Sequence, residues 1–340
     1  MRSLKAILMI SILVLYSQAS IAAKGGGSGP SPSDYVDVGA PGSQSLGTWA
    51  IGDGDQSPVQ SLCTASANYS QKNPNPAWSP APVQEPYSFK VTDLSAAAGY
   101  YLYLNGDTTQ TGNGRIPVEF DHQDTLQPVG YETLSNDVYD SHYHLGQFSG
   151  CSNGNNSDLR MRLISTNLAQ AKAGTYTGTF RAGAIGGSSG TVVSTADFTA
   201  TITIANAVQV SGLSNINIGT WAGGADKIAE GSFCVYSNTA GATYSISISS
   251  PNQDASSNFF LVNPGATASI PYGLQFTDNV SASTGTTVGA TPISGAGNNS
   301  VPGCGGIANA KLIVSILATD MQTAPTDSYS DTITLVVVPQ

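Results

Sequence analysis

The sequence contains the same series of landmarks twice. In each copy a tryptophan preceded by Gly-Thr is followed by a cysteine, a second cysteine and a tyrosine; these residues are Trp49, Cys63, Cys151 and Tyr176 in the first copy, and Trp221, Cys234, Cys304 and Tyr329 in the second. The tyrosine follows the second cysteine at the same distance in both copies. This repeat indicates two homologous domains, which we place at residues 41–205 and 206–340. Because both copies share the tryptophan, we expect it to pack in each core.

The segment ahead of the repeats has the pattern of an export signal. A basic start is followed by the apolar stretch Ala6–Tyr16 and then by small residues, which is the construction of a secretory signal. We therefore expect residues 1–23 to direct export through the Sec pathway. Residues 24–40 are expected to form a flexible lead, because Lys24–Ser33 is rich in Gly, Ser and Pro and has no alternating apolar residues.

Export bears directly on the four cysteines. Disulfides form in oxidising compartments, and two cysteines in each copy pair most simply as Cys63–Cys151 and Cys234–Cys304. Zinc is the rival use of cysteine, but the sequence has no CxxC or Cys-His spacing. Two disulfides are therefore predicted.

Apolar and polar residues alternate along most of the chain, as in Phe198–Ile202, Tyr244–Ile248 and Ile333–Val337. A period of two is typical of strands with one buried face. Only Ser165–Ala173 has the pattern of a short helical turn. Many short strands separated by polar turns predict an all-β protein made of two tandem Ig-like β-sandwich domains.

The charge and the motifs argue against several classes of function. The formal net charge is −10, and a nucleic-acid partner would require a basic stripe. The sequence has no Gly-x-Ser-x-Gly elbow, His-Glu-x-x-His motif or phosphate-binding glycine loop. Glu119 and Asp121 resemble a glycosidase pair, but carboxylates two residues apart are common on strands. We expect neither catalysis nor a cofactor.

The first copy contains two insertions, Asn73–Pro86 and Asp121–Phe148. Insertions on a β-sandwich become loops, and loops often carry binding sites. Their aromatic side chains would suit contact with a sugar ring or an apolar surface; the alternative is that they anchor the loops to the sandwich. The candidate ligand-binding residues are Trp78, Tyr139, Tyr143 and Phe148.

All three histidines, His122, His142 and His144, lie in the second insertion. On a strand, His142 and His144 would point to the same face, and three aspartates lie nearby in the sequence. A divalent metal site is therefore conceivable. Histidines in a polar loop are more often ordinary polar residues, and we predict no metal site.

The second domain contains two short motifs. Asp327–Val337 has Tyr-Ser-Asp-Thr followed by alternating residues, and Ile270–Leu274 reads Ile-Pro-Tyr-Gly-Leu. Both resemble chaperone–usher pilus subunits, particularly those of the spore-coat-U (archaic) type. Tyr176–Thr179 and Ile116–Val118 are the weaker matching positions in the first domain. The Pro-Gln ending, in place of an aromatic residue, and the placement of the cysteines depart from that pattern.

The resemblance implies pilin-like sandwiches, the second of which lacks a strand and is completed by a donor strand. It also implies three partners: a periplasmic chaperone, an outer-membrane usher and an adjacent pilus subunit. The assembly strand would include Asp331, Ile333, Leu335 and Val337.

A donor extension needs an alternating apolar run, which Lys24–Ser33 lacks. The resemblance therefore implies a two-domain tip adhesin of a cell-surface fimbrium, which binds a glycan, a host surface or an abiotic surface through its N-terminal domain. The alternatives are a free secreted carbohydrate- or surface-binding module and a structural coat or matrix protein.

Overall fold

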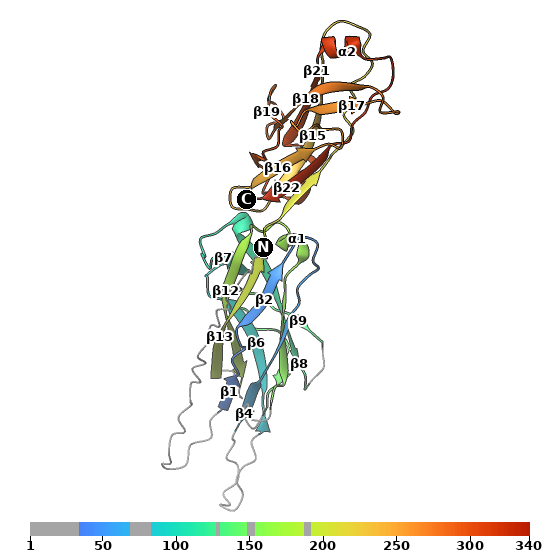
Figure 1. Cartoon of the computed structure of the whole chain (residues 1–340). Helices are drawn as coiled ribbons and strands as arrows, with labels where there is room; N and C mark the ends of the chain where they lie inside the picture. The colour runs from blue at the N-terminus through green and yellow to red at the C-terminus, as the bar shows by residue number, and fades with distance from the viewer. Residues whose placement is uncertain (1–33, 69–82, 127–129, 148–153, 187–191) are drawn as a thin grey trace, which may run out of the picture.

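The structure is a computed structural model that describes residues 34–68, 83–126, 130–147, 154–186 and 192–340. These residues form two β-rich bodies joined end to end (Figure 1). The only α-helices in the described ranges are α1 (Ser165–Leu168) and α2 (Ala318–Thr323). Neither is long and apolar enough to cross a membrane. The all-β prediction is confirmed.

The first domain contains strands β1 to β13. Their bounds are β1 Asp34–Val38, β2 Gln44–Trp49, β3 Val59–Leu62, β4 Thr64–Asn68, β5 Val83–Gln84, β6 Pro86–Asp93, β7 Tyr100–Leu104, β8 Arg115–Asp124, β9 Glu132–Thr133, β10 His144–Leu145, β11 Ser157–Arg162, β12 Gly174–Gly186 and β13 Val192–Ile204. The main sheet has the order β10-β6-β12-β7-β8-β11-β3, with β13 pairing β12 and β2, and β9 pairing β8. A second sheet has the order β1-β4-β5.

Strand β1 lies inside the segment that was expected to be a flexible lead. That expectation is wrong for Asp34–Val38, because β1 pairs antiparallel with β4. The physical reason is a short alternation in Tyr-Val-Asp-Val, which places Val36 and Val38 in the buried core. Burial of these two valines and pairing with β4 together hold the strand.

The core of the first domain is largely aromatic. Phe120 on β8 makes edge-on contacts with Tyr100, Phe180 and Phe198, at ring-centroid distances between 4.9 and 5.9 Å. Such edge-to-face pairs add to the stabilisation that burial provides. Trp49 is only 2% exposed in the same core, which confirms its expected scaffold role.

The second domain contains strands β14 to β22. Their bounds are β14 Val208–Ser211, β15 Lys227–Ser237, β16 Thr243–Ser249, β17 Phe259–Val262, β18 Ser269–Thr277, β19 Thr286–Thr287, β20 Ile293–Ala296, β21 Ala310–Ile316 and β22 Thr334–Pro339. One sheet has the order β14-β15-β21-β18-β17, with β19 on β18, and the other has the order β20-β16-β22. Their inward side chains, among them Phe233, Tyr244 and Phe276, form one core.

The two domains meet through a few specific contacts. The Tyr236 hydroxyl donates to the Ala169 carbonyl at 2.9 Å, and the Ala173 amide donates to the Asn238 carbonyl at 2.8 Å. Ile51 of the first domain packs against the second domain's cluster of Cys234, Tyr236 and Cys304. These contacts tie the loops at the end of the first domain to β15.

One predicted disulfide is confirmed, because Cys234 is bonded to Cys304. Cys63 is also disulfide-bonded, and Cys151, its predicted partner, lies outside the described residues. The confirmed bond joins the end of β15 to a tight turn, the 3-10 element Pro302–Gly306.

Candidate functional site

The landmarks of the sequence repeat have the same structure in both domains. The glycine of the Gly-Thr-Trp triplet has a φ of 75° at Gly47 and 74° at Gly219, a left-handed conformation that glycine adopts without strain. The indole of Trp49 donates to the Gly54 carbonyl at 3.0 Å, and that of Trp221 donates to a carbonyl four residues on at 3.2 Å. The two Gly-Thr-Trp segments are therefore structural counterparts.

The repeated tyrosines identify a second pair of counterparts. The hydroxyls of Tyr176 and Tyr329 each donate, at 2.9 Å, to the carbonyl four residues upstream, in Lys172 and Pro325. A tyrosine bonded back to the upstream backbone is the tyrosine corner of Ig-like sandwiches. Tyr176 lies near the start of β12 and Tyr329 just precedes β22, so β22 is the counterpart of β12.

In the first domain, β13 lies between β12 and β2. It runs antiparallel to β12 along the whole length of both strands. It runs parallel to β2, with a register shift opposite Leu46 and Gly47. The Gly-Thr-Trp strand and the tyrosine-corner strand are thus bridged by β13, and both use their hydrogen-bonding edges to hold it.

The second domain contains both bridged segments, but the described residues include no strand between them. One edge of β22 pairs with β16, and the other has no strand partner among the described residues. Residues 214–221, the counterpart of β2, belong to no strand of the described chain. We call the half-buried apolar surface shared by β22, β14 and residues 214–221 the open groove.

The burial of equivalent residues agrees with an open groove. Phe180, Ala182 and Ala184 on β12 are completely buried. Their counterparts at the same distances after Tyr329 are Ile333, Leu335 and Val337, and these are only half-buried. Apolar residues on the other side of the groove are half-buried as well. The half-buried groove residues are Val208, Val210, Ile216, Ile218, Ile333, Leu335 and Val337.

Trp221 is also less buried than its counterpart in the first domain. The sequence predicts that it packs in the core like Trp49, but the structure leaves it half-buried at the margin of the core. The prediction is wrong to that extent. Trp49 lies on a strand paired with β13, whereas Trp221 belongs to no strand of the described chain.

Two of the four expected assembly residues precede the strand. β22 begins at Thr334, so Asp331 and Ile333 lie before it, and Leu335 and Val337 lie on it. The Asp331 carboxylate accepts hydrogen bonds from Ser250 and Tyr272, both at 2.6 Å. Tyr272 belongs to the Pro-Tyr-Gly-Leu stretch, so the two motifs that carry the family resemblance contact each other.

Asp331 thus acts as a brace for the start of β22. Its carboxylate also accepts a bond from Asn252 at 2.8 Å, and burial together with the Asp331 charge raises the pKa of Tyr272. Hydrogen bonds to a charged group are stronger than neutral ones. The aspartate therefore links the residues before β22 to Ser250, Asn252 and Tyr272, a contact that the sequence pattern did not reveal.

The aromatic residues proposed for ligand binding have different environments. Tyr143 is 75% exposed, as expected for a contact residue. Tyr139 is half-buried, with the Lys90 ammonium 4.7 Å from its ring centroid. Trp78 and Phe148 lie outside the described residues. Tyr143 is therefore the best-supported contact candidate in the described chain.

The carboxylate pair is held by arginines. Arg162 contacts Glu119 at 2.6 Å, and both Arg160 and Arg162 contact Asp121 at 2.8 Å. Burial acts to raise the pKa of Asp121, but the Thr133 hydroxyl and these arginines outweigh it and lower the pKa. A carboxyl held ionised in this way is poorly suited to serve as a general acid.

The histidines are arranged differently from the expected pair. His142 is exposed and contacts Glu132, whereas His144 is buried on β10. The expectation that these two rings share a face is wrong, because only His144 enters the strand. The structure instead brings His144 next to His122, with Asp140 between them.

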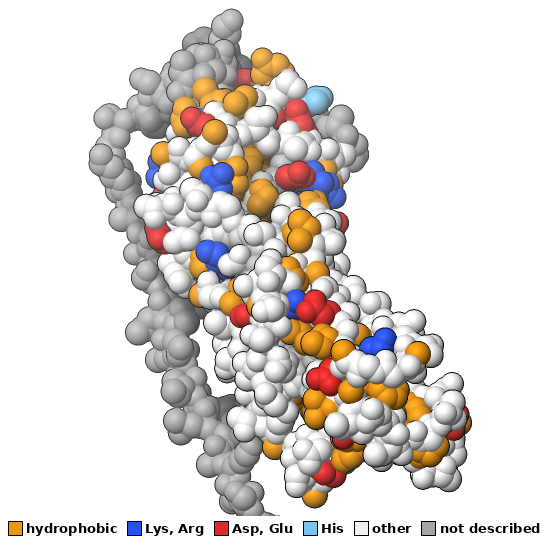
Figure 2. Space-filling view, turned by 90° about the horizontal axis from the view of Figure 1, so that it is seen from above, with side chains coloured by type: hydrophobic (Ala, Val, Ile, Leu, Met, Phe, Trp, Pro, Cys, Tyr) orange, Lys and Arg blue, Asp and Glu red, His pale blue; other side chains and the backbone are white. Residues whose placement is uncertain are grey.

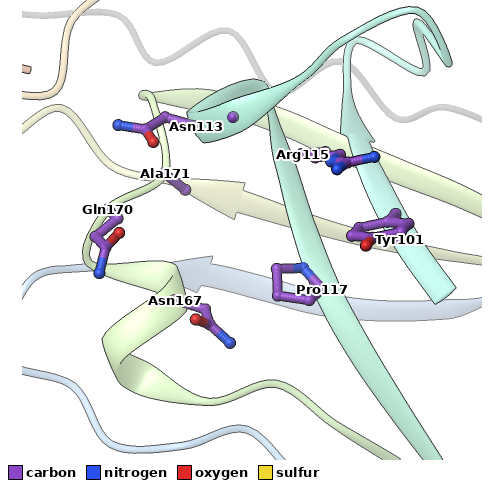
Figure 3. A pocket seen from close by; sticks show the side chains of 8 residues that line it. Tyr101, Asn113, Arg115, Pro117, Asn167, Gln170 and Ala171 are labelled. Carbon is purple, nitrogen blue, oxygen red and sulfur yellow. The ribbon is translucent and has the colours of Figure 1, made fainter. Parts of the chain in front are cut away.

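A shallow pocket of the first domain lies beside the domain junction. Figure 3 shows that Tyr101, Arg115 and Pro117 line one side of it and that Asn167 and Gln170 line the other. Arg115 stacks over the Tyr101 ring at 4.2 Å. The pocket places no carboxylate beside a nucleophile.

The visible surface agrees with the low charge of the sequence. The face shown in Figure 2 carries mainly uncharged polar and hydrophobic side chains, with isolated rather than clustered basic groups. Contacts made through such a surface depend on apolar and hydrogen-bonding groups more than on charge.

No protein-family model and no curated protein matches this chain. Among solved structures, it is similar to a chain of the CsuC–CsuE chaperone–tip adhesion subunit complex from archaic chaperone–usher Csu pili of Acinetobacter baumannii. The identity is 12%, the TM-score is 0.44, and the match covers 89% of this chain and 100% of the other.

Two further structures also match along most of the chain. CfaE, the adhesive subunit of CFA/I fimbria of enterotoxigenic Escherichia coli, matches at 10% identity and a TM-score of 0.36, covering 88% of this chain and 93% of the other. The CupB6 tip adhesin of Pseudomonas aeruginosa matches at 9% identity and a TM-score of 0.35, covering 90% and 95%. At these identities no residue role is carried over. The chain is similar in structure to tip adhesins of chaperone–usher pili.

Proposed function

We propose that this protein is the tip subunit of a chaperone–usher surface fibre. In this proposal it is exported through the periplasm, its second domain accepts a strand from the adjacent subunit, and its first domain binds a surface or glycan ligand. This proposal rests on the open groove, where one edge of β22 has no strand partner in the described part of the chain and lies beside half-buried apolar side chains.

The groove favours a strand as its occupant. A free edge next to apolar side chains is a template for pairing with another chain. Strand addition supplies both kinds of interaction, because the added backbone bonds to the edge and alternate side chains fill the apolar positions. β13, with Phe198, Ala200 and Ile202 buried, shows in the first domain what such an occupant looks like.

The proposal predicts that the protein depends on a partner for solubility. Expressed alone in the periplasm, the chain is expected to aggregate or be degraded, since its open groove stays exposed. Co-expression with its cognate chaperone is expected to give a soluble one-to-one complex, which size-exclusion chromatography would detect. A stable monomer obtained without a partner would contradict the proposal and favour a free secreted binding module.

The first domain is proposed as the binding domain because its described loops expose an aromatic side chain, Tyr143. Tyrosine offers a large contact area at a low entropy cost. We expect Tyr143→Ala to reduce attachment to glycan-coated or polystyrene surfaces by about 10-fold, which corresponds to about 1.4 kcal/mol and to a contact residue of more than average weight. The amount of protein bound to the surface is measured as a function of the protein concentration applied.

The matched control for that experiment is Ile228→Ala. Ile228 is 69% exposed, but it lies on β15 of the second domain. Its replacement is expected to leave attachment unchanged. Equal attachment by the wild type and Tyr143→Ala would remove this loop from the proposed ligand site.

A further inference from the structure

Three potential metal ligands from separate parts of the chain converge inside the first domain. His122 lies on β8, His144 lies on β10, and Asp140 lies between β9 and β10. The Asp140 Oδ2 atom is 2.7 Å from His144 Nε2 and 3.5 Å from His122 Nδ1. The candidate donor atoms all lie within 4.8 Å of one another.

His122 is completely buried and stacks on an aromatic ring. Its side chain is 0% exposed and stacks on Phe89 at a ring-centroid distance of 4.1 Å. Among the described residues neither of its ring nitrogens has a hydrogen-bond partner, although Asp140 Oδ2 lies 3.5 Å from Nδ1, and His144 Nδ1 also lacks one. A buried polar atom without a partner costs free energy, and an ion bound at His122 Nδ1 would give that nitrogen a partner.

The chemistry of the three groups matches a divalent transition-metal ion. Zinc binds imidazole nitrogen and carboxylate oxygen at 2.0–2.2 Å, which places neighbouring tetrahedral ligand atoms about 3.3 Å apart. The two distances from Asp140 lie on either side of that value. The neutral form of imidazole is the form that binds metals.

We propose that His122 Nδ1, His144 Nε2 and Asp140 Oδ2 bind Zn²⁺ or a similar divalent transition-metal ion. The ion takes the place of the hydrogen between His144 Nε2 and Asp140 Oδ2, so His144 binds it as the tautomer that carries its proton on Nδ1. The other oxygen of Asp140 accepts a hydrogen bond from the Phe89 amide at 2.9 Å. Such an outer contact orients a ligating carboxylate.

Asp124 adds negative charge beside the site without serving as a ligand. It is completely buried, and its two oxygens accept hydrogen bonds from the amides of Leu126 and Leu145 at 2.7 and 2.8 Å. Each oxygen of Asp124 therefore already accepts one backbone hydrogen bond.

The ion would fasten a surface loop to the sandwich. Asp140 and His144 flank the segment that carries the exposed Tyr143, and His122 is anchored in the main sheet through its pairing with β11. Linking these three residues fixes the base of that loop. The inference concerns the first domain alone and does not depend on the proposed role of the open groove.

The test is metal binding by the mature full-length chain, purified with its chaperone if it requires one. After removal of metal with EDTA, the protein is titrated with Zn²⁺ and, separately, with Co²⁺. We expect about one ion per chain, a rise in the melting temperature of the first domain, and the visible absorption of tetrahedral Co²⁺. Absence of both stoichiometric binding and the cobalt spectrum would overturn the proposal.

Two histidine variants locate the ion. His144→Gln is expected to raise the Kd for Zn²⁺ by at least about 100-fold, since even outer contacts are worth 10- to 100-fold. His142→Gln is the matched control, because His142 lies two residues away but is exposed and contacts Glu132. Equal binding by the two variants would place the ion elsewhere and overturn the assignment.

Discussion

Extending the chain with a copy of its own β13 is expected to stabilise the second domain by about 4 kcal/mol. The added segment consists of a short Gly-Asn turn after Gln340 followed by the sequence of Val192–Ile204. β13 runs antiparallel to β12, and β22 is the counterpart of β12, so the extension reaches the open groove as a hairpin. Asn-Gly and Gly-Asn pairs are suited to such tight turns.

The expected size follows from the burial of the groove. Complete burial of a Val, Leu or Ile side chain is worth about 1.5–3 kcal/mol, so each of the seven half-buried groove residues stands to gain roughly 1 kcal/mol. Burial of the inward side chains of the copied strand and its backbone hydrogen bonds add to that total, and the cost of ordering the added residues, about 1–2 kcal/mol each, opposes it. Urea unfolding gives the free energy, and size-exclusion chromatography shows whether the extended chain becomes monomeric.

The control extension has the same length and turn but carries serine at the positions copied from Phe198, Ala200, Ile202 and Ile204. These four residues are the buried face of β13 in the first domain. The control strand keeps the backbone donors and acceptors and loses the apolar face. If both extensions stabilise the domain equally, or neither does, the groove is not a site for an alternating apolar strand.

The sequence predicted the architecture well because its signals are local. Strand alternation, the Gly-Thr-Trp triplets and the repeated tyrosines each depend on a few neighbouring residues, and the structure gives the triplets and tyrosines equivalent roles in both domains. The Cys234–Cys304 pairing could also be predicted, since each copy holds only two cysteines.

The features that sequence reasoning missed depend on register between distant strands. His142 and His144 were expected to share a face, but the partner of His144 is His122, on another strand. Asp331 was expected on the assembly strand, but it braces Tyr272. A shift of one residue in strand register reverses the face of every side chain, so short motifs cannot determine such contacts.

Removing the Cys234–Cys304 disulfide is expected to destabilise the second domain by about 4 kcal/mol. The two cysteines are 70 residues apart, and closing a loop of that length restricts the unfolded chain by about this amount. The variant is Cys234→Ser with Cys304→Ser, and calorimetry of the purified protein gives the change. A loss below about 1 kcal/mol would mean that the bond does not limit the unfolded chain.

The same bond also lies at the domain junction, so its effect on the unfolded chain must be separated from its effect on the contact between the domains. Cys234 and Cys304 pack with Tyr236 and with Ile51 of the first domain, and the Tyr236 hydroxyl donates across the junction to Ala169. Tyr236→Phe removes only that hydrogen bond and is expected to cost about 1 kcal/mol. If Tyr236→Phe lowers stability as much as the double serine variant does, the junction rather than loop closure is the main source of the stabilisation.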